Sequence, residues 1–111
     1  MNISTSMKKG ILVIRAEGDL DMHVSNQFRQ TFDEALDSSG ARSAVLNFQG
    51  ITFVDSSGIG VILGRYKRIT AQGGKMAVTN LEPQVQKLFE LAGLSQIIHF
   101  FNNETEALEM L

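Results

Sequence analysis

The sequence predicts a single α/β domain over residues 1–111, with a mixed, mostly parallel sheet of about five strands and four helices. Two observations predict this class. Short runs of β-branched and apolar residues alternate along the chain with amphipathic stretches of helical period, an order typical of parallel sheets. The chain also has 111 residues, 43% of them hydrophobic, and one proline, which suffices for one buried core.

Local patterns predict the first three elements. Residues 11–16 form an apolar run between glycines, which predicts a strand, and residues 3–7 are expected to pair with it antiparallel across a Lys8-Lys9-Gly10 turn. Apolar residues then recur at helical spacing, and Gly40 ends this helix as a C-terminal glycine does. The helical positions are Val24, Phe28, Phe32, Ala35 and Leu36, and Asp21 is expected to cap the helix.

The remaining elements alternate between strand and helix. Residues 44–48 are almost wholly apolar, as expected of a strand that is covered on both faces. A second helix follows Asp55 and stops at Gln72, and a third opens at Pro83, a residue that suits the first helical position. Two further strands and a final helix are expected at residues 75–79, 97–101 and 104–111.

The composition excludes several classes of function. A net charge of −2 and a pI near 5.6 argue against nucleic acid as the main partner, because nucleic-acid-binding proteins carry a basic patch. The absence of cysteine excludes disulfides, thiol catalysis and cysteine-bound metal. The apolar run at residues 11–14 is too short for a signal peptide or a membrane span. We therefore expect a cytoplasmic protein that binds neither nucleic acid nor membrane.

The most informative segment is residues 53–60, where an apolar run ends in Asp55-Ser56-Ser57-Gly58 and a helical pattern begins at once. The first N–H groups of a helix lack intrahelical partners, and the helix dipole favours negative charge there. The site therefore suits a serine that carries or contacts a phosphate. Residues 18–21 follow another strand, and we expect both loops at the carboxyl edge of the sheet, where α/β proteins bind ligands.

Glycines inside the second helix indicate a close approach to its surface. Gly60 and Gly64 are four residues apart and form a flat strip with Ser57. Each glycine costs about 1 kcal/mol relative to alanine at an exposed helical site. We expect either the chain's own sheet or another protein to approach this strip.

The glycines and aspartates also bring nucleotide binding and metal binding into question, and the sequence favours neither. The order of Gly58, Gly60 and Gly64 misses the dinucleotide-binding spacing by one residue, and no Walker-type lysine follows, so no nucleotide cofactor is expected. Three carboxylates at the strand ends suit Mg²⁺, but capping is the better explanation of Asp21, so no metal is expected. These carboxylates are Asp19, Asp21 and Asp55.

A small serine hydrolase is the alternative from a different class. It would use Ser56, Asp55 and His23, but Val54 stands where the nucleophile motif G-x-S-x-G requires glycine. His23 is more simply a solvated residue near the start of a helix, and His99 a packed or edge residue of an apolar strand. The sequence therefore provides no credible catalytic set. Asp55 or Ser56 could equally be a plain helix cap, but one cap does not need three capping-type residues in a row.

The residues from Phe53 to Leu63 resemble the signature of bacterial anti-sigma factor antagonists, which are STAS domains. Residues 18–21, 45–48 and 88–94 resemble the family's acidic loop, central strand and third helix, so the resemblance covers nearly the whole chain. Residues 60–67 are most similar to the sporulation branch, which acts on the anti-sigma factor of sigma factor F. A general-stress antagonist or another stand-alone STAS regulator is the alternative within the family.

The resemblance implies a switch without catalytic residues of its own. It implies phosphorylation of Ser56 by the anti-sigma factor, itself a serine kinase that uses its bound ATP, and dephosphorylation by a phosphatase of the PP2C type. The unphosphorylated form would bind the anti-sigma factor and release the sigma factor, and the phosphorylated form would not. The partner-binding residues expected on this chain are Asp21, Asp55, Ser57, Gly58, Gly60, Gly64 and Arg65, with Arg65 and Arg68 on the exposed side of the second helix.

Overall fold

A computed structural model describes residues 1–111 and contains one five-stranded sheet whose strand order follows the chain. The first two strands pair antiparallel and all other neighbours are parallel. The predicted fold class is therefore confirmed. The strands are β1 (Asn2–Lys8), β2 (Ile11–Leu20), β3 (Ala44–Val54), β4 (Met76–Thr79) and β5 (His99–Phe101).

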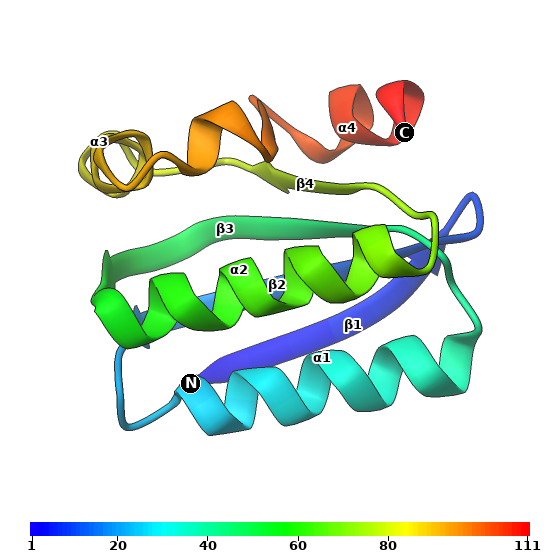
Figure 1. Cartoon of the computed structure of the whole chain (residues 1–111), viewed down its shortest axis with the longest axis horizontal. Coiled ribbons are helices and arrows are strands. Elements are labelled where there is room, and N and C mark those ends of the chain that lie inside the picture. Colours follow the sequence, from blue (N-terminus) through cyan, green and yellow to red (C-terminus); the bar gives the residue numbers. More distant parts are fainter.

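Three long helices pack on one face of the sheet, and a short C-terminal helix packs on the other (Figure 1). Every β-α-β connection steps in the same direction along the sheet, and right-handed crossovers then place all three connecting helices on one side. The helices are α1 (Ser25–Ser39), α2 (Ser56–Ala71), α3 (Pro83–Leu91) and α4 (Glu104–Met110), with a 3₁₀ turn at Leu94–Gln96. None of them is long and apolar enough to cross a bilayer.

The main core lies between the sheet and the three long helices. It contains 21 buried residues, and its centre is a row of phenylalanines from α1, β3 and α3. Phe48 lies edge-on to Phe28 and Phe89, with ring centroids 6.0 and 6.3 Å away. Burying one such side chain contributes about 1.5–3 kcal/mol, so this row holds α1 and α3 on the sheet.

A smaller core and a polar anchor hold α4 on the second face. Ala107 of α4 covers four strand residues, Ile11, Val13, Val45 and Ala77. The Glu104 carboxylate accepts hydrogen bonds from the Arg15 Nε and Nη2 atoms at 2.7 and 2.8 Å. It also accepts from Asn47 Nδ2 at 2.7 Å and Lys8 Nζ at 3.3 Å. The hydrogen bonds from Arg15 above all lower the pKa of Glu104 to about 2.

The two central strands are longer than predicted and irregular. Arg15 pairs with Asn47 but Glu17 with Gly50, so β3 has one residue more than β2 in this interval. A second irregularity follows, where Gly18 pairs with Ile51 and Asp19 with Phe53. Such bulges bend a strand and change which side chains face outward. They explain why Thr52 and Phe53 are both exposed although they are adjacent in β3.

Two boundary predictions are wrong. The last strand begins at His99 and not at residue 97, because the 3₁₀ turn carries the chain through Ile97 before pairing with β4 starts. Asp21 does not cap α1, which begins at Ser25 with Val24 in the capping position and no side-chain cap.

Candidate functional site

The Asp55 side chain starts α2 and fixes the position of Ser56. Asp55 has an extended backbone, and its Oδ1 atom accepts a hydrogen bond from the Gly58 amide at 3.0 Å. Aspartate is among the best residues for this capping role. Ser56 is therefore the first residue of α2, as the sequence predicts.

The same carboxylate joins two loops. Its Oδ2 atom accepts a hydrogen bond from the Met22 amide at 3.1 Å, and the Asp55 amide donates to the Leu20 carbonyl at 3.3 Å. The loop after β2 and the loop after β3 therefore form one continuous rim at the carboxyl edge of the sheet. The Asp55 carboxylate is therefore a contact that both loops share.

Ser56 is exposed on this rim, whereas Ser57 is half-buried. Only the exposed hydroxyl is freely accessible to another protein. The early amides of α2 and the helix dipole surround it, an environment that stabilises an added negative charge by about 0.3–2 kcal/mol. The two serines thus differ in the way that a single modification site requires.

Gly58 is buried in the packing of the rim, which corrects its expected place among the partner-binding residues. A Cβ atom at this position would lie 2.3 Å from the Leu20 carbonyl oxygen and 2.8 Å from the Val54 Cγ1 atom. Only glycine lets α2 begin this close to β2. The role of Gly58 is therefore to bring Ser56 to the rim.

Gly60 and Gly64 have the opposite environment. A Cβ atom at either position would meet nothing within 4 Å, so the chain's own sheet does not approach this strip. Of the two explanations that the sequence left open, the internal one is excluded.

The acidic residues of the rim do not converge on a metal site. The Asp21 Oδ1 atom accepts from the His23 amide at 2.9 Å, and Asp19 Oδ1 accepts from Thr52 Oγ1 at 3.0 Å. No group of three or more histidine, cysteine, aspartate or glutamate side chains is arranged to hold a metal ion. Their oxygens instead hold the two loops in shape.

Arg65 is not on the exposed side of α2, which corrects another prediction. Its side chain is 13% exposed, and its Nη1 atom lies 3.0 Å from the Asp33 Oδ2 atom of α1. Burial lowers the pKa of Arg65, and the charge of Asp33 opposes this. Arg68 also pairs with Asp33, at 3.0 Å, and with Asp37. The two arginines therefore join α2 to α1.

The histidines do not complete a hydrolase. The His23 amide bonds to Asp21, and no histidine is hydrogen-bonded to Ser56. His99 is exposed on the edge strand β5, with its ring stacked on Phe101 at a centroid distance of 6.2 Å. The expectation for His99 is thus confirmed.

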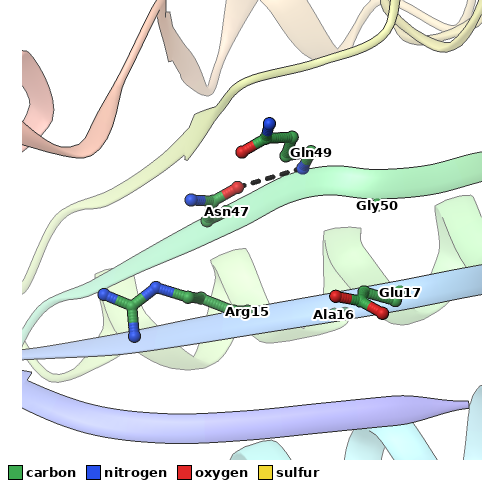
Figure 2. A pocket seen from close by; sticks show the side chains of 6 residues that line it. All are labelled: Arg15, Ala16, Glu17, Asn47, Gln49 and Gly50. Carbon is green, nitrogen blue, oxygen red and sulfur yellow. Dashed lines mark hydrogen bonds between the residues drawn. The ribbon is translucent and has the colours of Figure 1, made fainter.

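Two features gave no signal in the sequence. A polar hollow of about 410 Å³ lies over the first bulge of β3, lined by Arg15, Ala16, Glu17, Asn47, Gln49 and Gly50 (Figure 2). Within it, the Asn47 side chain accepts a hydrogen bond from the Gln49 amide at 3.0 Å. The other feature is a pair of apolar side chains on the rim, Met22 and Phe53, which are 70% and 49% exposed.

Comparisons with known proteins identify the family to which this chain belongs. The model of the STAS domain matches residues 2–107. An anti-sigma F factor antagonist of Paenibacillus polymyxa is 42% identical over 100% of this chain and 97% of that protein. An anti-sigma-B factor antagonist of Staphylococcus aureus is 23% identical over 96% of each chain.

Two solved structures of SpoIIAA, an anti-sigma factor antagonist and cell-fate determinant of Bacillus, have the same fold. The unphosphorylated form is 31% identical with a TM-score of 0.82, and the match covers 98% of this chain and 95% of that one. The phosphorylated form is 30% identical with a TM-score of 0.75, and the match covers 98% of both. With a family match over residues 2–107, the chain belongs to the STAS domain family.

Proposed function

We propose that this chain is an anti-sigma factor antagonist whose binding is switched off by phosphorylation of Ser56. The observation that carries the proposal is the exposed Ser56 hydroxyl at the start of α2, set in place by Asp55 and Gly58. The relatives named above support it, since one bears the name of anti-sigma F factor antagonist and another is known in a phosphorylated form. These relatives are regulatory proteins, and the chain is not an enzyme.

The partner in this proposal is an anti-sigma factor that is also a serine kinase. With the rim docked in its ATP site, the Ser56 hydroxyl oxygen attacks the γ-phosphorus, the bond to the β-phosphate oxygen breaks, and ADP leaves. In this proposal Asp21 orients the hydroxyl or accepts its proton; in support, the loop that carries Asp21 is joined to the Ser56 loop by the hydrogen bond from the Met22 amide to Asp55. A PP2C-type phosphatase then hydrolyses the phosphoserine and restores the antagonist. All of these steps belong in the cytoplasm.

Phosphorylation is expected to change the surface and not the fold. A phosphoserine carries about −1.5 to −2 charges at pH 7, and the start of a helix tolerates that charge. Both forms of SpoIIAA match this chain over most of its length, in support of this view. Binding is blocked by bulk and by charge at the docking surface, where like charges forced together cost several kcal/mol.

The sigma F pathway is favoured over a general-stress pathway. The identity to the sigma F antagonist is 42%, against 23% for the sigma-B antagonist. The surface around Ser56 is the proposed contact with the anti-sigma factor; it includes the exposed Gly60 and the half-buried Ser57 and Gly64.

Mass spectrometry tests the proposal. The chain is mixed with the anti-sigma F factor from the same genome and ATP, and the intact mass is recorded with the modified peptide. The parent chain and Ser57→Ala should gain one phosphoryl group, and Ser56→Ala none. Phosphorylation that persists in Ser56→Ala, or no gain of mass in the parent chain, would refute it.

A further inference from the structure

Acidic residues gather at one end of the molecule. The loops that start α1, α2 and α3 comprise residues 18–26, 51–60 and 80–86, and all three helices begin at the same end (Figure 1). These loops contain four carboxylates and no lysine or arginine. We call this end the acidic rim, and its carboxylates are Asp19, Asp21, Asp55 and Glu82.

Basic residues occupy the opposite end. The turns that enter β2, β3 and β4 comprise residues 8–10, 40–43 and 72–75, and they contain no carboxylate. Their basic residues are Lys8, Lys9, Arg42 and Lys75. The net charge of −2 therefore hides a separation of charge along the molecule, although Lys8 is paired with Glu104 of α4. Since no cation of these loops neutralises the acidic rim, its field is directed outward to an approaching partner.

Apolar side chains also stand on the acidic rim. Met22 is 70% exposed, and its amide is held by Asp55, the residue next to Ser56. Phe53 is 49% exposed because the second bulge of β3 turns it outward beside Asp19. Large apolar side chains surrounded by charge on a fixed backbone are the usual anchors of a protein interface.

We propose that the acidic rim docks onto an electropositive surface of the anti-sigma factor, with Met22 and Phe53 seated in an apolar pocket surrounded by lysine or arginine side chains. The inference rests on the function proposed above and adds the chemistry of the partner. A kinase holds its nucleotide phosphates with cationic groups, so its docking face has the charge that this rim complements.

A second copy of this chain is the competing occupant, because its basic end would also attract the acidic rim. Such a contact joins two different surfaces of identical chains. Repetition of such a contact produces rings or open filaments, neither of which the switch proposed above requires. A separate partner is therefore favoured, and self-association becomes an outcome of the test.

The test measures association and dissociation rates between the unphosphorylated chain and the anti-sigma F factor from the same genome with ADP bound, at low and at physiological salt. Glu82→Gln removes one charge from a side chain without a hydrogen bond or ion pair in the structure, and Glu109→Gln on α4 is its matched control. Met22→Ala removes the anchor, and Met110→Ala, 66% exposed on α4, is its control. Thermal unfolding confirms that all four variants are folded.

Glu82→Gln should slow association at low salt about twofold or more, an effect that physiological salt reduces. Met22→Ala should speed dissociation about fivefold or more, as loss of an anchor does. Both α4 variants should bind like the parent chain. If Glu82→Gln and Met22→Ala also bind like the parent while Ser56 is still phosphorylated, this inference fails and the proposed function survives. No complex with the parent chain, or salt-sensitive self-association in place of a complex, overturns the inference as well.

Discussion

Replacing Glu104 by glutamine should destabilise the fold by weakening the attachment of α4 to the sheet. The Glu104 side chain is 14% exposed and holds Arg15 through two hydrogen bonds. Its pKa falls from 4.5 to about 2 on folding. At about 1.4 kcal/mol per pKa unit, this difference corresponds to roughly 3 kcal/mol of stability for the charged form. Because Arg15 is 38% exposed, solvent screening reduces the value, and we expect Glu104→Gln to lose about 2–3 kcal/mol at pH 7.

The stability difference between the parent chain and Glu104→Gln should depend on pH, in a direction that the depressed pKa of Glu104 sets. A carboxylate with a depressed pKa stabilises the fold above its unfolded pKa, here 4.5, and this contribution is lost as the pH falls toward about 2. The gap between the parent chain and Glu104→Gln should therefore shrink by more than half between pH 7 and pH 3. Urea unfolding followed by circular dichroism measures both values, with Glu109→Gln as control. A gap below about 0.5 kcal/mol at pH 7, or one that does not shrink in acid, refutes the reasoning.

Three variants around the proposed phosphorylation site separate packing from binding. Gly58→Ala should destabilise the fold by about 1–3 kcal/mol in urea unfolding, because the added Cβ atom would meet the Leu20 carbonyl. A stability equal to that of the parent chain would contradict the close packing of Gly58 against β2. The double variant Gly60→Ala/Gly64→Ala should instead raise stability by about 1 kcal/mol per site and weaken binding to the anti-sigma factor. Unchanged binding would show that the glycine strip lies outside the interface. Asp55→Ala should lose about 1 kcal/mol or more and speed amide exchange of both rim loops, whereas exchange confined to α2 would show that the loops are independent.

The sequence was sufficient for features that depend on neighbours along the chain. The alternation of strands and helices follows from hydrophobic period, and the position of Ser56 follows from the capping preference of Asp55. The burial of Gly58 also had a local signal, because it lies four residues before Ile62 and on the same helical stripe. The prediction that Gly58 binds the partner overlooked this stripe, and the tight approach to Leu20 is the reason for glycine at this position.

Other features depend on contacts between distant segments. The burial of Arg65 depends on Asp33, which lies on a different helix and is 32 residues away in the chain. The exposure of Phe53 depends on a bulge in β3, which no residue pattern in that strand announces. The anchor of α4 similarly joins residues from three strands to Glu104. Such contacts become visible only when the strand register is known.

The most direct test of the central claim compares the two phosphorylation states of one preparation. Equal amounts of the unphosphorylated and the Ser56-phosphorylated chain are titrated against the anti-sigma F factor in complex with its sigma factor, and release of the sigma factor is measured. The unphosphorylated chain should release it, and the phosphorylated chain should not, although the backbone NMR shifts of the two forms differ only near the rim. Equal release by both forms, or large shift changes throughout α1 and α2, would contradict a switch that acts through the surface at Ser56.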